Sequence, residues 1–345
     1  MRYIGIIIIL VLCVTLLLLT GCIVNTVIPE TAIENLENQE NTEEPVMLWS
    51  GLGMGLFSTA NTSEFDGYVD DLLANGFTDI RLDIVSSFNS SALTISKSAV
   101  AIAVGKGVNI IWGVCSGDHI LTSSNWATHR QGILNAAQWA QDNGVYEFQL
   151  GNEEERCNDD TTLTDIQLIT NLKSVAADVQ KIFTRGKISY TCDNWYIVDW
   201  ITAGKGDIDI LASNVYMGYG SNKTDLWKTQ ITNLVNAFGV DGTYLTEFGP
   251  NSSGLDYYST DEAVQATGVA EMIDYIKASG ITRAFYFCYK NPFWQSDLHG
   301  ARKDDDTYRL LWNQALLNTG PVESTTVLTK TTTISLPDTI ALIPK

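Results

Sequence analysis

Short apolar runs alternate with longer segments of helical spacing along most of the chain. Eight runs have the length and the β-branched character of buried strands, and each is followed by a segment whose apolar residues recur three and four positions apart. Glycine or asparagine stands at or just after most of the predicted helix ends, as left-handed caps require. The expected strands span 47–53, 78–84, 108–114, 145–151, 187–192, 208–216, 243–248 and 283–289. The expected helices span 64–75, 92–105, 124–143, 163–184, 195–203, 225–238, 261–279 and 306–318.

This alternation predicts an α/β fold with a parallel sheet and right-handed crossovers. Eight βα units within roughly 250–300 residues favour closure into a (β/α)8 TIM barrel, which we expect to occupy 46–319 as one domain. An open, doubly wound sheet is the alternative fold.

The N-terminal segment has the pattern of an export signal. Met1 and Arg2 precede an apolar run from Ile4 to Leu19, which is short for a transmembrane helix of about 20 residues. The run ends in Leu-Thr-Gly-Cys, which resembles the lipobox of bacterial lipoproteins. That resemblance implies cleavage of a signal peptide at 1–21 and lipid attachment to Cys22. An uncleaved signal anchor is the alternative.

Two further segments flank the expected barrel. Residues 22–45 are rich in Glu and Asn and lack Lys and Arg, so we expect an acidic, flexible tether. Residues 320–345 form a Thr-rich tail that fits an added strand, a spacer or a loosely ordered terminus. With the lipid at Cys22, the protein is expected to be exported and anchored to the cell envelope, with no other membrane contact.

Composition and charge exclude several functions. The 21 Lys+Arg and 40 Asp+Glu give a formal net charge of −19, which disfavours nucleic acid as a partner because that affinity comes mainly from Lys and Arg. No CxxC pair or His/Cys cluster has zinc spacing, so we expect no metal and no cofactor. An exported protein reaches an oxidising compartment, so one or two disulfides can form among Cys115, Cys157, Cys192 and Cys288. The sequence does not determine which cysteines pair.

Two short motifs resemble other kinds of site but lack their full pattern. Gly51–Gly55 reads GxGxG rather than the dinucleotide-binding GxGxxG, so we interpret it as a turn at the barrel mouth. A nucleophile elbow of the form GxSxG is absent from the sequence.

A glutamate stands at the end of the fourth expected strand and another at the end of the seventh. These are Glu153, in Gly-Asn-Glu, and Glu247, in Thr-Glu-Phe-Gly. In a TIM barrel the active site lies at the carboxyl ends of the strands. Two carboxylates that face each other there suit glycoside hydrolysis, in which one protonates the leaving oxygen and the other attacks the anomeric carbon or activates water.

On these residues the sequence resembles glycoside hydrolases of clan A, of the family 5 and family 39 type. The resemblance implies that Glu153 is the acid/base and Glu247 the nucleophile of a retaining enzyme, with carboxyl groups about 5–5.5 Å apart. It also implies that Asn152 binds the sugar 2-hydroxyl and that Arg81 and Tyr216 contact the nucleophile. Family 5 usually continues Asn-Glu-Pro after strand four, where this sequence has Asn-Glu-Glu, and the Trp that often ends strand eight in the clan is missing, which leaves the family number open.

The same residues have physical roles that can be stated without the resemblance. A neighbouring Arg81 should keep Glu247 ionised, whereas Glu247, Glu154 and Glu155 should raise the pKa of Glu153. The competing interpretation is that Glu153–Glu155 is a solvated charge run and that Arg81 pairs with Asp79 or Asp83.

Aromatic residues at predicted strand ends complete the picture, because sugar rings stack on such side chains. Candidate substrate contacts are Trp49, Trp112, Trp195, Trp294 and His119, and about half of the aromatic residues are expected to be core.

The sequence therefore predicts a monomeric hydrolase of β-linked, neutral glucan- or mannan-like saccharides. The negative net charge disfavours polyuronates as substrates. A carbohydrate-binding barrel without activity and a transglycosylase are the alternatives.

Overall fold

The computed structural model describes residues 48–58, 61–82, 84–117, 119–157, 163–217, 226–250, 262–291 and 300–318. The chain divides into the units Met1–Pro45 and Val46–Lys345, and all described residues belong to the second. The predicted signal peptide, Cys22, the tether, Trp294 and the tail at 320–345 lie outside the described residues. Within the described part, no helix is both long and apolar enough to cross a membrane.

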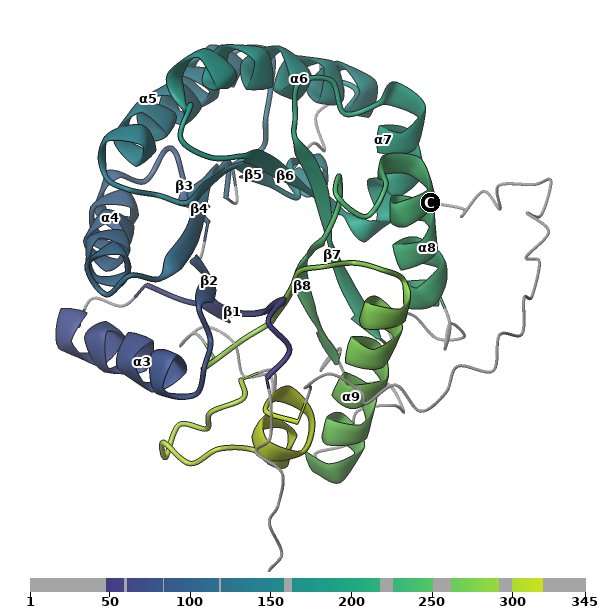
Figure 1. Cartoon of the computed structure of the whole chain (residues 1–345). Coiled ribbons are helices and arrows are strands. Elements are labelled where there is room, and N and C mark those ends of the chain that lie inside the picture. The colour runs from purple at the N-terminus through teal and green to yellow at the C-terminus, as the bar shows by residue number, and fades with distance from the viewer. Residues whose placement is uncertain are drawn as a thin grey trace, which may run out of the picture. The chain divides into compact units, whose positions relative to one another are not determined.

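Eight parallel strands close into a barrel, which confirms the predicted fold (Figure 1). Their order is β2-β1-β9-β8-β7-β6-β5-β4, and β2 pairs with β4 to complete the ring. A short ninth strand, β3 (Val85–Ser86), pairs with the end of β4. The barrel strands are β1 (Leu52–Leu56), β2 (Asp79–Leu82), β4 (Asn109–Cys115), β5 (Glu147–Asn152), β6 (Ile188–Asp193), β7 (Ile210–Met217), β8 (Leu245–Pro250) and β9 (Ala284–Tyr286).

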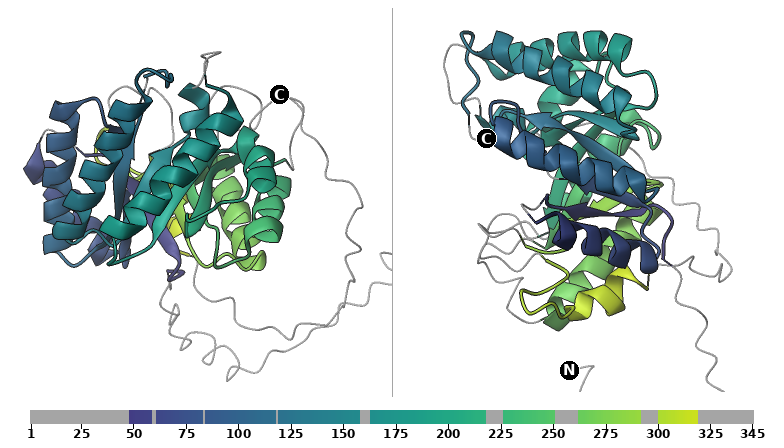
Figure 2. Two further views of the ribbon diagram at one scale, coloured as in Figure 1. Left: turned by 90° about the horizontal axis from the view of Figure 1, so that it is seen from above. Right: turned by 90° about the vertical axis from the view of Figure 1, so that its left-hand side faces the viewer.

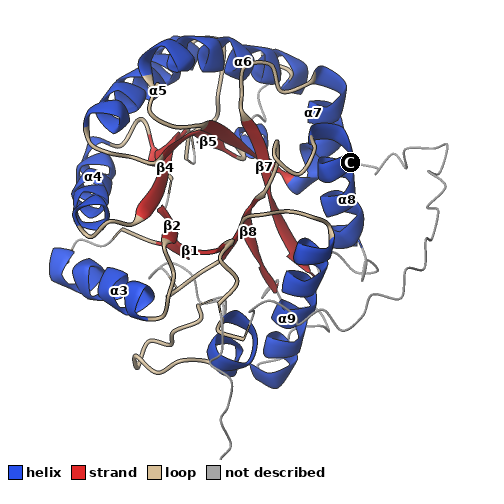
Figure 3. Ribbon diagram, in the orientation of Figure 1, coloured by secondary structure: helices blue, strands red, loops and turns tan. Residues whose placement is uncertain are grey.

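Helices surround the strands, as the colouring by element type shows (Figure 3). Two views turned by 90° show them packed along the outside of the sheet (Figure 2). They are α3 (Thr62–Ala74), α4 (Ser90–Gly105), α5 (Trp126–Asp142), α6 (Asp165–Ile182), α7 (Ile197–Ala203), α8 (Leu226–Phe238) and α9 (Glu262–Ala278). The capping box of Thr164 and Gln167 starts α6, and Gly144, with a φ of 86°, follows α5 in the left-handed conformation.

Two predicted elements differ from the structure. The helix expected at 306–318 is the short π-helical segment η3 (Trp312–Leu316), in which Leu317 N donates to Trp312 O. The first strand begins at Leu52, so Gly53 and Gly55 are strand residues rather than a turn. Gly53 is required there by close packing, because a Cβ would lie 2.4 Å from the Phe285 ring.

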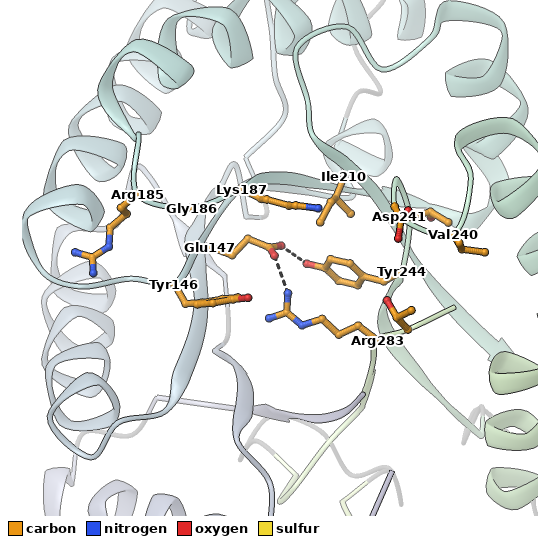
Figure 4. A pocket seen from close by; sticks show the side chains of 12 residues that line it. Tyr146, Glu147, Arg185, Gly186, Lys187, Ile210, Val240, Asp241, Tyr244 and Arg283 are labelled. Carbon is orange, nitrogen blue, oxygen red and sulfur yellow. Dashed lines mark hydrogen bonds and ion pairs between the residues drawn. The ribbon is translucent and has the colours of Figure 1, made fainter. Parts of the chain in front are cut away.

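The N-terminal end of the barrel is closed by an ion-pair cluster (Figure 4). Arg283 Nη1 donates to Glu147 Oε2 at 2.7 Å, and Arg283 Nη2 lies 3.0 Å from Asp79 Oδ1. The Tyr244 hydroxyl donates to the other oxygen of Glu147, whose side chain is 1% exposed. A cavity of about 350 Å³ lies against this cluster and is lined in part by Tyr146. At this end of a TIM barrel such contacts serve stability.

Replacing Arg283 by methionine is expected to lower the free energy of unfolding by about 3–5 kcal/mol, because Glu147 would keep a buried charge without its partner. Urea unfolding measures the change. Arg185→Met is the matched control, since Arg185 lines the same cavity but is exposed, and it should change stability by less than about 0.5 kcal/mol. Equal losses in the two variants would contradict this role of the ion pair.

Candidate active site

Glu247 lies in β8 at the carboxyl end of the barrel, where two donors hold its carboxylate. Arg81 Nη1 donates to Oε1 at 2.7 Å, and the Tyr216 hydroxyl, from β7, donates to Oε2. The Glu247 side chain is 12% exposed and that of Arg81 is 4% exposed. Both oxygens are therefore held in one orientation by groups that complement a negative charge. The structure thus brings Arg81 and Tyr216 into contact with Glu247, as the resemblance implied.

Arg81 also links Glu247 on β8 to two residues of β5. Its Nη2 donates to Asn152 Oδ1 at 2.7 Å and its Nε to Gln149 Oε1 at 2.8 Å. Of the two alternative partners of Arg81, Asp79 faces Arg283 at the opposite end of the barrel, and Asp83 lies outside the described residues. Because Arg81 binds three groups through three different nitrogens, its planar guanidinium fixes their relative positions.

Glu153 follows β5 directly, and its backbone has a positive φ of 53°, which is unusual for a residue other than glycine. Its N–H donates to the carbonyl oxygen of Thr191 at 2.8 Å. Its carboxyl group accepts from Asn214 Nδ2 at 2.9 Å on Oε1 and from Arg156 Nη1 at 3.1 Å on Oε2. The constrained backbone and the two donors together fix the direction of this side chain.

The pKa of Glu153 is raised to about 7 by burial first, and then by the negative charges of Glu247 and Asp193. The Arg156 guanidinium and the Asn214 amide act in the opposite direction. A carboxyl group with this pKa holds a proton for a large part of the time at neutral pH, which suits a general acid.

Glu154 and Glu155, which the sequence predicted to raise this pKa by their proximity, face other parts of the protein. Both oxygens of Glu154 accept from Ser116 N at 3.0 Å, and the Trp200 indole donates to Glu155. They are 0% and 1% exposed, so the three glutamates are not a solvated charge run either. Adjacent residues at this turn point in different directions, which the sequence does not reveal.

Four polar residues of the site were missed by the sequence analysis. Asn214, 2% exposed, donates to Glu153 and lies 3.4 Å from Asn152 Oδ1. Gln149 accepts from Arg81 inside the barrel. Arg156 and Asp193 form an ion pair beside Glu153. The positions of Asn214 and Asp193 near strand ends were the available indication, since those ends converge at the mouth of the barrel.

The aromatic predictions divide into two groups. Trp112 is fully buried and its indole donates to Ser96 of α4, so this side chain faces the helices and the predicted contact with substrate is wrong. Trp49 precedes β1 and therefore lies at the N-terminal end of the barrel, away from both glutamates, which contradicts its predicted role as well. Trp195 follows β6 and His119 follows β4, so both lie at the carboxyl end of the strands. Their contact with substrate stays a prediction.

A different aromatic pair, Phe57 and Phe287, extends from Tyr216, which donates to Glu247. The Phe287 ring packs edge-on against Tyr216, with centroids 6.1 Å apart, and against Phe57, with centroids 5.5 Å apart. Phe287 follows β9 directly, so the aromatic side chain at the end of this strand, where the resemblance implied a Trp, is a phenylalanine.

Neither a disulfide nor a metal cluster is found among the described side chains. Cys115, Cys192 and Cys288 are buried and are not joined to one another. In the described part of the chain, no three His, Cys, Asp or Glu side chains lie together as metal ligands would.

Fold and site together define a (β/α)8 barrel with two glutamates at the carboxyl end of its strands. No protein-family model and no curated protein matches the sequence. Among solved structures, the barrel is similar to an endocellulase of the archaeon Pyrococcus horikoshii, at 13% identity, with 79% of this chain and 91% of that chain covered and a TM-score of 0.59. A complex of a variant of that endocellulase with cellotetraose gives 14% identity, the same coverage and a TM-score of 0.57.

Two other structures have a similar barrel. A GH10 endoxylanase from a sugarcane soil metagenome is 12% identical, with 77% of this chain and 95% of that chain covered and a TM-score of 0.57. A β-glucuronidase of Parabacteroides merdae is 14% identical, with 76% of this chain but 35% of that chain covered and a TM-score of 0.57. At these identities the likeness establishes the fold.

Proposed function

We propose that this protein is a retaining glycoside hydrolase that cleaves β-glycosidic bonds. The observation that carries the proposal is the contrast between the two glutamates. Glu247 is held by a cation and a hydroxyl donor, whereas the pKa of Glu153 is raised to about 7 by burial and by nearby negative charge. Two carboxyl groups whose environments differ in this way fit the roles of nucleophile and acid/base.

In the first step, Glu247 attacks the anomeric carbon while Glu153 gives its proton to the departing glycosidic oxygen. The product is a glycosyl ester on Glu247 and a released alcohol. In the second step, Glu153, now a carboxylate, takes a proton from water as the water attacks the same carbon and frees Glu247. Asn152, held by Arg81 at 2.7 Å, would bind the sugar 2-hydroxyl and strengthen that contact in the transition state.

For the substrate, we propose a neutral β-linked saccharide such as a glucan or mannan. The similar structures include an endocellulase bound to cellotetraose, an endoxylanase and a β-glucuronidase. Their names denote enzymes that act on β-glycosides, which supports the β-linkage. The net charge of −19 supports a neutral glycan over a polyanionic one. We further propose export and lipid attachment at Cys22, which loss of lipid labelling in Cys22→Ala would test.

A panel of polysaccharides tests the function, with released reducing ends as the measurement. The panel contains β-glucans, mannan, xylan and a polyuronate, and the mature protein is compared with Glu247→Gln. We expect cleavage of a neutral β-glycan by the native protein alone. Binding without cleavage across the panel would indicate a carbohydrate-binding barrel, and longer products without new reducing ends would indicate a transglycosylase.

A further inference from the structure

Arg156 occupies a position between the acid/base and a second acid. It lies in η1 (Glu154–Cys157), the short turn after Glu153, and its backbone N–H donates to the Glu153 carbonyl oxygen at 3.0 Å. Because of this turn, the Arg156 guanidinium lies beside the Glu153 carboxyl group. Arg156 Nη1 lies 3.1 Å from Glu153 Oε2, and Arg156 Nε lies 3.3 Å from Asp193 Oδ2.

The two carboxyl groups are held in matching ways. One oxygen of Glu153 accepts from Asn214 and the other from Arg156. One oxygen of Asp193 accepts from Trp195 N at 2.7 Å and the other pairs with Arg156. In each case a buried or backbone donor holds one oxygen, and Arg156, whose side chain is 54% exposed, holds the second. Arg156 is thus the contact that both acids share.

We propose that Arg156 and Asp193 are positioning residues that fix the orientation and the proton affinity of the acid/base, an inference that rests on the proposed function of Glu153. Asp193 is 5% exposed and supplies a negative charge, although burial raises its pKa, and Arg156 supplies the opposing positive charge. The same carboxyl group must give up a proton in the first step and accept one in the second, so its proton affinity has to stay near the working pH. The pair acts on Glu153 from η1 and the end of β6, whereas Arg81 on β2 binds Glu247.

Charged and titratable groups approach Glu153 from every neighbouring element. Glu247 on β8 and Asp193 on β6 favour its protonated form, and Arg156 on η1 opposes them. Cys192 on β6 and Tyr216 on β7 also lie within electrostatic range, but burial raises the pKa of each well above its usual value, so both are neutral at working pH. Asn214 is uncharged. Arg156 and Asp193 are therefore the charges near Glu153 that can be removed without touching the nucleophile or the residues that bind it.

The proposal is tested by the pH dependence of kcat/KM, whose alkaline limb should shift in opposite directions in Arg156→Gln and Asp193→Asn. In the native protein, kcat/KM should fall above about pH 7 as Glu153 loses its proton. Arg156→Gln removes a cation and should move this limb to higher pH by at least about 0.5 unit, whereas Asp193→Asn removes an anion and should move it to lower pH by a similar amount. Arg156→Lys keeps the charge and should restore the native limb while kcat stays lowered, because the fork that spans both acids is lost.

A measurement without turnover separates this inference from the proposed function. The carboxyl carbon of Glu153 can be titrated by NMR in protein labelled with carbon-13 glutamate, with Glu153→Gln for assignment. Its pKa should rise in Arg156→Gln and fall in Asp193→Asn whether or not any glycan is cleaved. Arg130→Gln, which removes an ion pair with Asp178 on the outer helices, is the matched control and should leave the titration unchanged. An unchanged titration in both test variants, or shifts in the same direction, would overturn the proposal, while a panel without cleavage would overturn the function alone.

Discussion

Replacing Glu247 by glutamine is expected to lower kcat/KM by about 10⁴–10⁶-fold, which is the scale seen when a covalent nucleophile is removed. Glutamine has nearly the same shape, and its amide oxygen can still accept from Arg81 while its NH2 group can donate to the Tyr216 hydroxyl oxygen, but that amide oxygen carries no charge with which to attack the anomeric carbon. Initial rates on an activated aryl β-glycoside measure the loss.

The control for this variant is Glu271→Gln, in which an exposed glutamate that pairs with Lys228 on the outer helices is changed in the same way. It should keep native activity. Urea unfolding shows whether the Glu247 variant is folded. A folded Glu247→Gln protein with more than about one hundredth of native activity would contradict the assignment of the nucleophile.

Replacing Glu153 by glutamine is expected to lower kcat/KM by about 10²–10⁴-fold on substrates with poor leaving groups, because general acid catalysis contributes on that scale. Substrates whose leaving group needs no proton should be affected much less in the first step and should accumulate the glycosyl enzyme, since the base for the second step is missing. Steady-state rates across a series of aryl glycosides with increasing leaving-group pKa measure this dependence.

The alkaline limb of the pH profile should also disappear in Glu153→Gln, since the group whose pKa is raised to about 7 is gone. An equal loss for every leaving group, with the alkaline limb retained, would show that another residue is the general acid.

The fold was predictable because the pattern of a strand followed by a helix can be recognised within each short segment and recurs eight times along the chain. Most strands fall on short runs rich in apolar and β-branched residues, and the segments between them have helical spacing of their apolar residues. The ends of β5 and β8 therefore located Glu153 and Glu247 without knowledge of any contact. Arg81 on β2 and Tyr216 on β7 followed from the resemblance to clan A glycoside hydrolases, not from the strand pattern.

The site residues that the sequence analysis misplaced or missed depend on the direction in which side chains point. A strand buried on both faces shows no alternation of polar and apolar residues, so whether Trp112 points to the barrel interior or to α4 cannot be read from it. Trp49 was misplaced because the strand was expected at 47–53, with Gly51–Gly55 as a turn at its end, whereas the strand is Leu52–Leu56. The positive φ at Glu153 sends Glu154 and Glu155 away from the site and returns Arg156 to it, a geometry that no residue pattern specifies.

Covalent trapping tests the central claim most directly. A 2-deoxy-2-fluoro glycosyl fluoride of the sugar found by the panel slows both steps, and more so the second, so the glycosyl enzyme accumulates for mass spectrometry of the intact protein and of its peptides. The account predicts one added sugar per protein, on the peptide that contains Glu247, and no label in Glu247→Gln. A label on another residue, or turnover of the native substrate with inversion at the anomeric carbon and no trapped ester, would contradict it.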